Sequence, residues 1–589
     1  YVEIDVGTVD EVNATAGDYI YILASDAGTI TADAGGFVGI IGLSSDGDID
    51  IVDVTGGEDV VVVNFGGDLG SVTAIASDDV TIGALENIAG VDAFSSDGSV
   101  FVGSSDGNIG NVTATAADNE DVTVAAPGGT IGDVDVSIRN STGVDDAGLT
   151  IAVFGSDGVG AVSLDKGIND GDQDIDVRTN AGGAVDVAVA GALSDDAGTV
   201  SITVASWTSD ADDAPDTLNL TLTGDTSDAV DVTIVGNPAV LLGPSDSAVE
   251  LETVSLAGDS NAIINLEAIS STLSTVDGET ATGDLTLLAQ VLPTSDGAPA
   301  PDLSITTGSG DDAIALDYVN PTNPEQVHAA LTVSTGAGDD VVGLQQTDDV
   351  NLFGDVTADL GEGNDVFIMD VVGATVTVDG GAGNDVIIVS SDSNNDVTTA
   401  SAVSGLPLGD LSDGGLTLTI DAGEGDDLVA VSAADAAAAG STIDLGTGTN
   451  TLYYGYDGSP SDSAFSDADT SAFDVTQGGN VTGSLTNLWL EADILVSSDV
   501  TLDIGGLGDI SYLATADIEI ASGEDAVGST LTIEGAASDF TLDVSQFDNG
   551  ADLGNSDDED DTYEDILRLG LTGVETLTVI ASDEVGVVL

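Results

Sequence analysis

Six segments between residues 307 and 454 carry glycine and aspartate at fixed places. Each follows the pattern x-Gly-x-Gly-x-Asp-x-U-x, where U is apolar, although the sixth segment has Asn450 where the others have aspartate. The segments are Thr307–Leu316, Thr335–Leu344, Leu360–Met369, Gly380–Val389, Ala422–Val431 and Leu445–Tyr454. Glycine permits positive φ, so such a turn can aim its carbonyls at an ion, and the aspartate adds a carboxylate. Because Ca²⁺ takes 6–8 oxygen ligands in a flexible geometry, the pattern predicts calcium-binding turns.

A second carboxylate directly precedes four of these turns. The residues concerned are Asp359, Asp379, Asp421 and Asp444. Turns that stack on one another bring successive aspartates close together, and like charges at short range are unstable unless cations lie between them. The sequence therefore predicts two candidate carboxylate ligands in each of these turns.

The segments resemble the RTX repeat, the glycine- and aspartate-rich nonapeptide of calcium-binding β-rolls, whose pattern is Gly-Gly-x-Gly-x-Asp-x-U-x. Gly380–Ile388 matches this pattern in full, and the other copies replace the first glycine. The resemblance covers residues 302–455 and implies that the sixth-place aspartates and the second-place carbonyls are calcium ligands. These are Asp312, Asp340, Asp365, Asp385 and Asp427, with the carbonyls of Gly308, Gly336, Gly361, Gly381 and Gly423.

The spacing of the copies departs from that family. RTX rolls repeat the motif in every nonapeptide, on both sides of each coil. Here the second-place glycines follow one another at sequence offsets of 28, 25, 20, 42 and 23. This spacing predicts one calcium turn per coil, on one edge, with irregular loops opposite.

Short strands must hold these turns in place. Over residues 1–165, apolar and polar residues alternate between glycines, and Gly28, Gly47 and Gly67 open equivalent segments at sequence offsets of 19 and 20. Gly67 begins the pattern Gly-x-[Ile/Leu]-Gly-x-Val, which recurs at Gly107–Val112 and Gly129–Val134. A period near 20 built from strands and turns is typical of one β-solenoid coil, which buries its apolar face only by stacking on the next coil.

We therefore predict an all-β chain of stacked parallel β-solenoid or β-roll segments with little helix, one short helical turn falling within Ala433–Ala439. Four parts are expected. Residues 1–205 form an N-terminal solenoid, and residues 206–300 form a second β-rich segment that ends in a proline-containing linker. Residues 301–455 form the RTX-like β-roll, and residues 456–589 form a C-terminal β-rich segment.

The composition of the chain excludes several classes of function. The 589 residues include 107 acidic and four basic side chains, one His and no Cys, for a net charge of −103. Binding to nucleic-acid phosphate or an anionic membrane needs Lys and Arg, cysteine-ligated metal sites need Cys, and serine triads need a His, for which only His328 is present. No apolar run reaches the roughly 18 residues of a membrane span. The acidity fits a halophile's solvated surface as well as bound cations, and the excess of Asp over Glu favours cations.

The motif, the low complexity and the theme Val574-Glu-Thr-Leu-Thr-Val579 resemble bacterial surface-layer proteins of the RTX type. The resemblance implies a secreted, non-enzymatic structural protein at the cell surface. We expect a homo-oligomeric layer or filament bridged by calcium, with a cell-surface polysaccharide as a candidate anchor. An adhesin fragment stiffened by calcium is the alternative, and a β-helix polysaccharide lyase or hydrolase is a third hypothesis.

Overall fold

Alternating apolar and polar residues, with glycine at the corners, make the chain a succession of short strands. The computed structural model describes residues 1–44, 47–117, 120–139, 149–165, 173–191, 199–206, 214–224, 230–234, 251–266, 272–291, 302–318, 329–346, 353–370, 375–390, 416–436, 438–455, 473–474, 481–496, 500–503, 510–520, 530–534, 536–543, 568–571 and 574–580. His328 and most of residues 456–480 lie outside these ranges. The chain divides into two units, Tyr1–Gln290 and Val291–Leu589.

The first unit contains strands of two to fifteen residues. They are β1 (Val2–Ala16), β2 (Ile20–Ala34), β3 (Val38–Gly42), β4 (Ile49–Gly56), β5 (Val60–Asn64), β6 (Leu69–Ala76), β7 (Val80–Ala84), β8 (Ile88–Ser95), β9 (Val100–Ser104), β10 (Ile109–Ala117), β11 (Val122–Ala126), β12 (Thr130–Ile131), β13 (Val134–Arg139), β14 (Leu149–Gly155), β15 (Gly158–Val159), β16 (Val162–Asp165), β17 (Gln173–Arg178), β18 (Ala184–Gly191), β19 (Val200–Ala205), β20 (Thr217–Gly224), β21 (Val230–Ile234), β22 (Thr253–Gly258), β23 (Ala262–Asn265), β24 (Thr275–Ala281) and β25 (Leu285–Val291).

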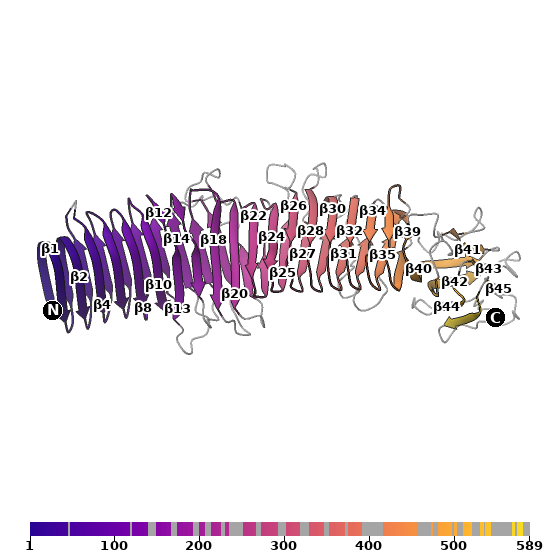
Figure 1. Ribbon diagram of the computed structural model, residues 1–589, viewed down its shortest axis with the longest axis horizontal. Coiled ribbons are helices and arrows are strands. Elements are labelled where there is room, and N and C mark those ends of the chain that lie inside the picture. The colour runs from indigo at the N-terminus through magenta and orange to yellow at the C-terminus, as the bar shows by residue number, and fades with distance from the viewer. Residues whose placement is uncertain are drawn as a thin grey trace, which may run out of the picture. The chain divides into compact units, whose positions relative to one another are not determined.

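Two parallel ladders run through this unit (Figure 1). One leads from β2 through β3, β5, β7, β9, β11, β14, β17, β19, β21 and β23 to β25, and the other from β2 through β4, β6, β8, β10, β13, β16, β18, β20 and β22 to β24. Ile49 of β4 pairs with Leu69 of β6, and Leu69 pairs with Ile88 of β8, at sequence offsets of 20 and 19, which confirms the predicted coil length.

The core of the first unit is a set of stacked columns. Ile22 pairs with Ile40, Ile40 with Val62, Val62 with Ile82, and Ile82 with Val102, and all five side chains are fully buried. Their neighbours in sequence point outward, because successive side chains of a strand alternate between its two faces. Each coil thus covers the apolar surface that its neighbour presents.

The second unit repeats the arrangement. Its strands are β26 (Leu303–Thr306), β27 (Ala313–Tyr318), β28 (Ala329–Ser334), β29 (Val341–Gln346), β30 (Phe353–Asp359), β31 (Val366–Asp370), β32 (Thr375–Asp379), β33 (Val386–Ser390), β34 (Thr417–Asp421), β35 (Leu428–Ser432), β36 (Thr442–Asp444), β37 (Asn450–Gly455), β38 (Phe473–Asp474), β39 (Val481–Thr482), β40 (Leu485–Val496), β41 (Val500–Asp503), β42 (Tyr512–Ile520), β43 (Thr530–Glu534), β44 (Asp539–Asp543), β45 (Arg568–Leu571) and β46 (Thr576–Ile580). One ladder leads from β27 through the odd strands to β37 and then through β40, β42 and β44 to β46; the other leads from β26 through the even strands to β36 and then to β39. The remaining four, β38, β41, β43 and β45, form a small parallel sheet of their own.

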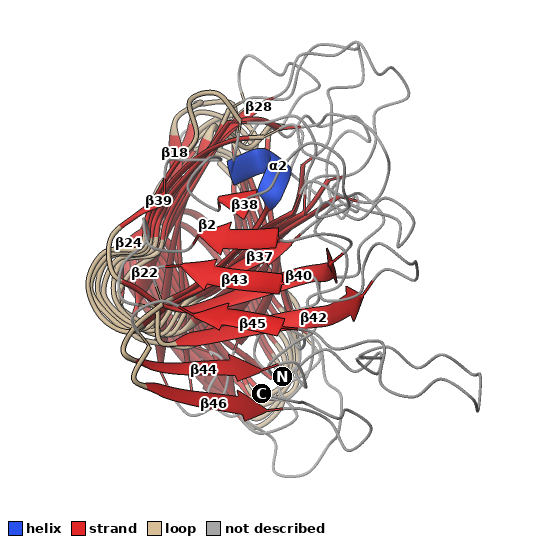
Figure 2. Ribbon diagram, turned by 90° about the vertical axis from the view of Figure 1, so that its right-hand side faces the viewer, coloured by secondary structure: helices blue, strands red, loops and turns tan. Residues whose placement is uncertain are grey.

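The predicted all-β solenoid class is confirmed. Among the described residues, 42 strands belong to the large parallel sheet, and the helix α2 (Ala433–Ala436) falls where a short helical turn was expected (Figure 2). No helix of the described part is long and apolar enough to cross a membrane. Parallel pairing continues from β18 to β20 across residue 206, and the finer four-part division stays a prediction.

Alternation across β7 gives a direct test of register. Replacing the buried Ile82 with alanine should lower the free energy of unfolding by about 2–5 kcal/mol, because it opens a cavity in a stacked column. The matched variant Thr81→Ala alters the neighbouring side chain, which points outward, and should change the free energy of unfolding by less than about 0.5 kcal/mol. Urea unfolding followed by circular dichroism measures both, and equal effects would contradict the register.

Candidate metal-binding turns

The motif turns stack one per coil. Each turn joins a strand of one ladder to a strand of the other, the first linking β26 to β27 and the last linking β36 to β37. Parallel bridges connect Ala337 to Glu362, Glu362 to Ala382, Ala382 to Glu424, and Glu424 to Thr447, all at the third motif place. The expected arrangement of one turn per coil, on a common edge, is therefore confirmed.

The glycines are required by the close approach of these turns. Gly363 and Gly383, at the fourth motif place, have φ of +149° and +144°, where side chains are rarely tolerated. A Cβ atom added to Gly383 would lie 1.4 Å from the carbonyl oxygen of Gly363 on the neighbouring coil. Only glycine lets the two backbones meet at this distance.

The predicted carbonyl ligands lie at the interfaces between coils. Each accepts a backbone N–H from the next coil at 2.9–3.2 Å; the five are Gly308, Gly336, Gly361, Gly381 and Gly423. A carbonyl oxygen has two lone pairs, so each of these atoms can still take one further partner.

The sixth-place aspartates form a continuous column, here called the aspartate ladder: Asp312, Asp340, Asp365, Asp385 and Asp427. All five are buried. Each backbone N–H from Asp312 to Asp385 donates to Oδ1 of the aspartate on the next coil, at 2.7–2.9 Å. Coil lengths of 28, 25, 20 and 42 residues all return the chain to this same contact.

The second carboxylate oxygens of the ladder are the unusual atoms. Oδ2 of Asp365, Asp385 and Asp427 is buried and accepts no hydrogen bond within the part of the chain that the structure describes. Burial raises the pKa of Asp340 and Asp365 to about 7 and the pKa of Asp385 and Asp427 to about 6. For Asp365 the carboxylates of Asp340 and Asp385 on the flanking coils raise the pKa further. The ladder therefore needs positive charge or protons to be stable.

Asn450 closes the ladder and shows what the aspartates lack. Its Oδ1 accepts the N–H of Asp427 at 2.9 Å, as each ladder aspartate does for its neighbour. Its Nδ2 then donates to the carbonyl oxygen of Leu445, the first residue of the same turn. In the same geometry an aspartate would present Oδ2 to the carbonyl in place of the amide, so two acceptors would face each other. A proton or a metal cation is what can join them.

The carboxylates that precede the turns form a second column. Asp359 pairs with Asp379, Asp379 with Asp421, and Asp421 with Asp444, and all four are exposed. The pKa of Asp421 is raised, first by burial and then by the charges of Asp379 and Asp444. This column runs beside the aspartate ladder, since the pKa of Asp385 also responds to the charge of Asp379.

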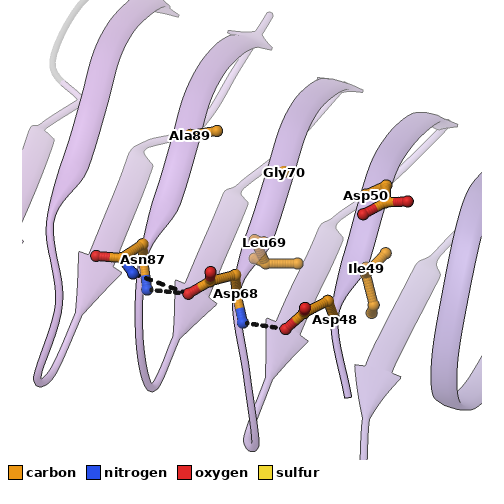
Figure 3. A pocket seen from close by; sticks show the side chains of 8 residues that line it. All are labelled: Asp48, Ile49, Asp50, Asp68, Leu69, Gly70, Asn87 and Ala89. Atoms are coloured by element: carbon orange, nitrogen blue, oxygen red, sulfur yellow. Dashed lines mark hydrogen bonds between the residues drawn. The ribbon is translucent and has the colours of Figure 1, made fainter. Parts of the chain in front are cut away.

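Sequence reasoning missed a third column, at the fifth motif place. There Asp339, Asn364 and Asn384 are exposed, and the oxygen of each accepts the backbone N–H of the next, at 2.7–3.0 Å. The sequence could have revealed this column, because the fifth motif place holds Asp or Asn in all five intact copies. The first unit has the same ladder of side-chain to backbone hydrogen bonds at Asp48, Asp68 and Asn87, which line a pocket (Figure 3). Both ladders tie coils together through hydrogen bonds.

Outside the motif turns, one buried aspartate is neutralised by a basic side chain. Asp176 makes a buried bidentate ion pair with Arg178, whose Nη2 lies 2.8 Å from Oδ2. Among the described residues, no three Asp, Glu or His side chains converge on one point. An ion at the turns would thus depend on backbone carbonyls as well as on one or two carboxylates.

The raised pKa values predict how stability depends on pH. Since the folded ladder holds its protons more tightly than the unfolded chain, the free energy of unfolding should fall as pH rises from about 4 to about 7 in chelator. Thermal unfolding across this range, at fixed moderate salt, measures the slope. The variant Asp365→Asn removes one such group and should flatten the slope, whereas an unchanged slope would contradict the assignment.

Comparisons of the chain with protein-family models, with curated proteins and with solved structures give no match. The likeness to RTX repeats therefore rests on the motif residues and on the way their turns stack.

Proposed function

We propose that residues 302–455 bind several Ca²⁺ ions along the aspartate ladder, and that the calcium-loaded solenoid is a structural subunit of an extracellular layer or filament. The observation that carries the proposal is the buried Oδ2 of Asp365, Asp385 and Asp427, which lacks a hydrogen-bond donor among the described residues. Buried carboxylates without a partner are costly, and one bound cation per turn removes that cost.

The donor set favours calcium over other metals. The candidate ligands are the ladder carboxylates, the exposed aspartates that precede the turns and the second-place carbonyls, all of them oxygen atoms. Hard cations such as Ca²⁺ prefer oxygen, whereas zinc and copper select nitrogen and sulfur. The third-place residue differs from turn to turn, whereas each turn supplies the same second-place carbonyl. This variation suits the flexible coordination of Ca²⁺ better than the strict octahedral coordination of Mg²⁺.

Bound calcium would supply stiffness and neutralisation. Each ion joins adjacent coils through atoms that otherwise repel, so its binding free energy adds to the stability of the folded solenoid. The ions also reduce a net charge of −103, which opposes both compaction and the approach of further copies. A stiff, repetitive and highly acidic solenoid with its carboxylates committed to its own turns supports a structural role rather than catalysis.

The variant Asp385→Asn tests the calcium ligands. By analogy with Asn450, its amide should donate to the carbonyl of Gly380, so the variant should melt at a higher temperature than wild type in EDTA. It should also lose one or two bound ions in a calcium titration, because the carboxylate lies between two coils. Asp426→Asn is the matched control, since it removes the exposed neighbouring carboxylate and should keep the full calcium content. Retention of every ion by Asp385→Asn would refute the ligand assignment.

Assembly tests the structural role. Millimolar Ca²⁺ should convert purified protein at micromolar concentration into ordered sheets or filaments, and EGTA should disperse them, because bridging cations cut the repulsion between acidic copies. Negative-stain electron microscopy and light scattering across a calcium titration measure the change. A chain that binds calcium but stays monomeric throughout would favour the adhesin hypothesis instead.

A further inference from the structure

Five adjacent strands of the first unit carry no charged residue on their outward face. It consists of the outward-facing residues within 39–43, 61–65, 81–85, 101–103 and 123–125, on β3, β5, β7, β9 and β11 and at their C-terminal ends, and is called the uncharged face below. None of these ranges contains Asp, Glu, Lys or Arg, in a chain with 107 acidic side chains.

Large apolar side chains stand out on this face. Leu43, Phe65 and Leu85 follow β3, β5 and β7 at equivalent positions, and they are 56%, 63% and 40% exposed. The N–H of Phe65 donates to Gly42 and that of Leu85 to Asn64, so the three side chains form one column across successive coils. Exposed apolar columns of this kind mark interaction surfaces.

Glycine keeps the face flat. A Cβ atom added to Gly103 would lie 2.8 Å from Cε1 of Phe101, so the aromatic ring covers the glycine on its own strand. Gly39 lies under the ring of Phe37 in the same way. The rings thus lie down along the sheet, and the surface is suited to another flat sheet.

Acidic residues border the uncharged face. Asp59, Asp79 and Asp121 directly precede β5, β7 and β11, while Asp68 and Glu86 lie in the turns that follow β5 and β7. A nonpolar centre with a charged rim is the usual anatomy of a protein interface.

The opposite ladder is different, because two of its strands, β4 and β8, carry charge on their outward faces. Asp50 and Asp53 of β4 and Asp92 of β8 are all exposed there. Ile51 of β4 and Ile75 of β6 are also exposed on that ladder. Ile51 lies between Asp50 and Asp53, whereas β6 carries no charged residue. From β4 to β10, charged and uncharged strands therefore alternate, and the unbroken run of uncharged strands, from β3 to β11, lies on the other ladder.

We propose that the uncharged face docks a second copy of this chain, face to face. Two copies that each carry −103 repel strongly, and this face lets them approach without bringing carboxylates together at the centre of the contact. Two flat parallel sheets can pack about 10 Å apart with their side chains interdigitated, and a two-fold axis would use the same residues on both copies.

The size of the face sets the expected strength of the contact. The five ranges hold 21 residues, at about 3.3 Å along a strand and about 4.8 Å between strands, which gives a projected area of roughly 330 Å² per copy. This is smaller than the area that stable specific interfaces bury, which corresponds to weak and reversible pairing. In a layer, many such contacts act together and give stable assembly through multivalency. The role of the pairing in a layer rests on the proposed function, whereas the face itself lies outside the calcium turns.

The test uses the full chain and charges placed on the face. Sedimentation velocity from 1 to 100 μM protein, with Ca²⁺ or with EGTA, should show pairing of the wild type. The double variant Leu43→Glu with Phe65→Glu should weaken pairing at least tenfold, and both sites are exposed, so folding should be kept. The matched control, Ile51→Glu with Ile75→Glu, charges the other ladder and should stay within about twofold of wild type. Circular dichroism verifies the fold of each variant.

Cysteine cross-linking locates the contact, because the chain has no native cysteine. Thr81→Cys, at the centre of the uncharged face, should form disulfide-linked dimers on mild oxidation. Thr113→Cys, exposed on β10 of the other ladder, should form them only at background level.

The outcomes separate this inference from the proposed function. Calcium-dependent sheets that form equally well with Leu43→Glu and Phe65→Glu would overturn the inference and leave the proposed function standing. Pairing that is lost in the double variant but does not respond to calcium or to Asp385→Asn would support the inference and count against the calcium proposal. A wild type that stays monomeric at 100 μM, yet binds an insoluble polysaccharide through this face, would overturn the second copy as the partner.

Discussion

Stacking in parallel register is the constraint on which the rest of this protein depends. Each residue lies beside its counterpart on the next coil, about 4.8 Å away, so every column is a contact between like positions. Stacking stabilises the apolar columns, in which Ile40, Val62 and Ile82 are fully buried against one another. Carboxylate columns have the opposite tendency, because like charges repel. How each acidic column is satisfied is therefore the main question that the fold poses.

The structure answers this question in three ways. At the fifth motif place the side chains are exposed, are either Asp or Asn, and accept backbone N–H groups. At Asn450 an amide replaces the carboxylate and supplies its own donor. On the buried ladder the carboxylates also accept backbone N–H groups through Oδ1, but Oδ2 of Asp365 has no donor among the described residues, and the pKa values of Asp340 and Asp365 rise to about 7. Only this last column requires something from solution, either protons or cations.

Much of the fold could be predicted because the residue types that specify it recur at short, regular spacings in the sequence. The regular recurrence of glycine at Gly28, Gly47 and Gly67 predicted the coil length, and strand alternation predicted the all-β class. The sixth-place aspartates stood out because two glycines precede each of them at fixed places. The buried pair of Asp176 with Arg178 could not be predicted in the same way, since an i, i+2 pair on one strand says nothing about what covers it. The uncharged face was equally hidden, because its residues meet only when strands one full coil apart in sequence are stacked side by side.

Coil length and turn position are independent in the second unit. The hydrogen bond from Asp365 to Asp385 spans 20 residues of chain, and that from Asp385 to Asp427 spans 42, yet both close at 2.9 Å. Differences in the number of residues per coil therefore leave the spacing of the turns unchanged. Successive turns stay one coil apart whether 20 or 42 residues separate them in sequence. A coil of this unit can thus gain or lose residues without displacing the turns on either side of it.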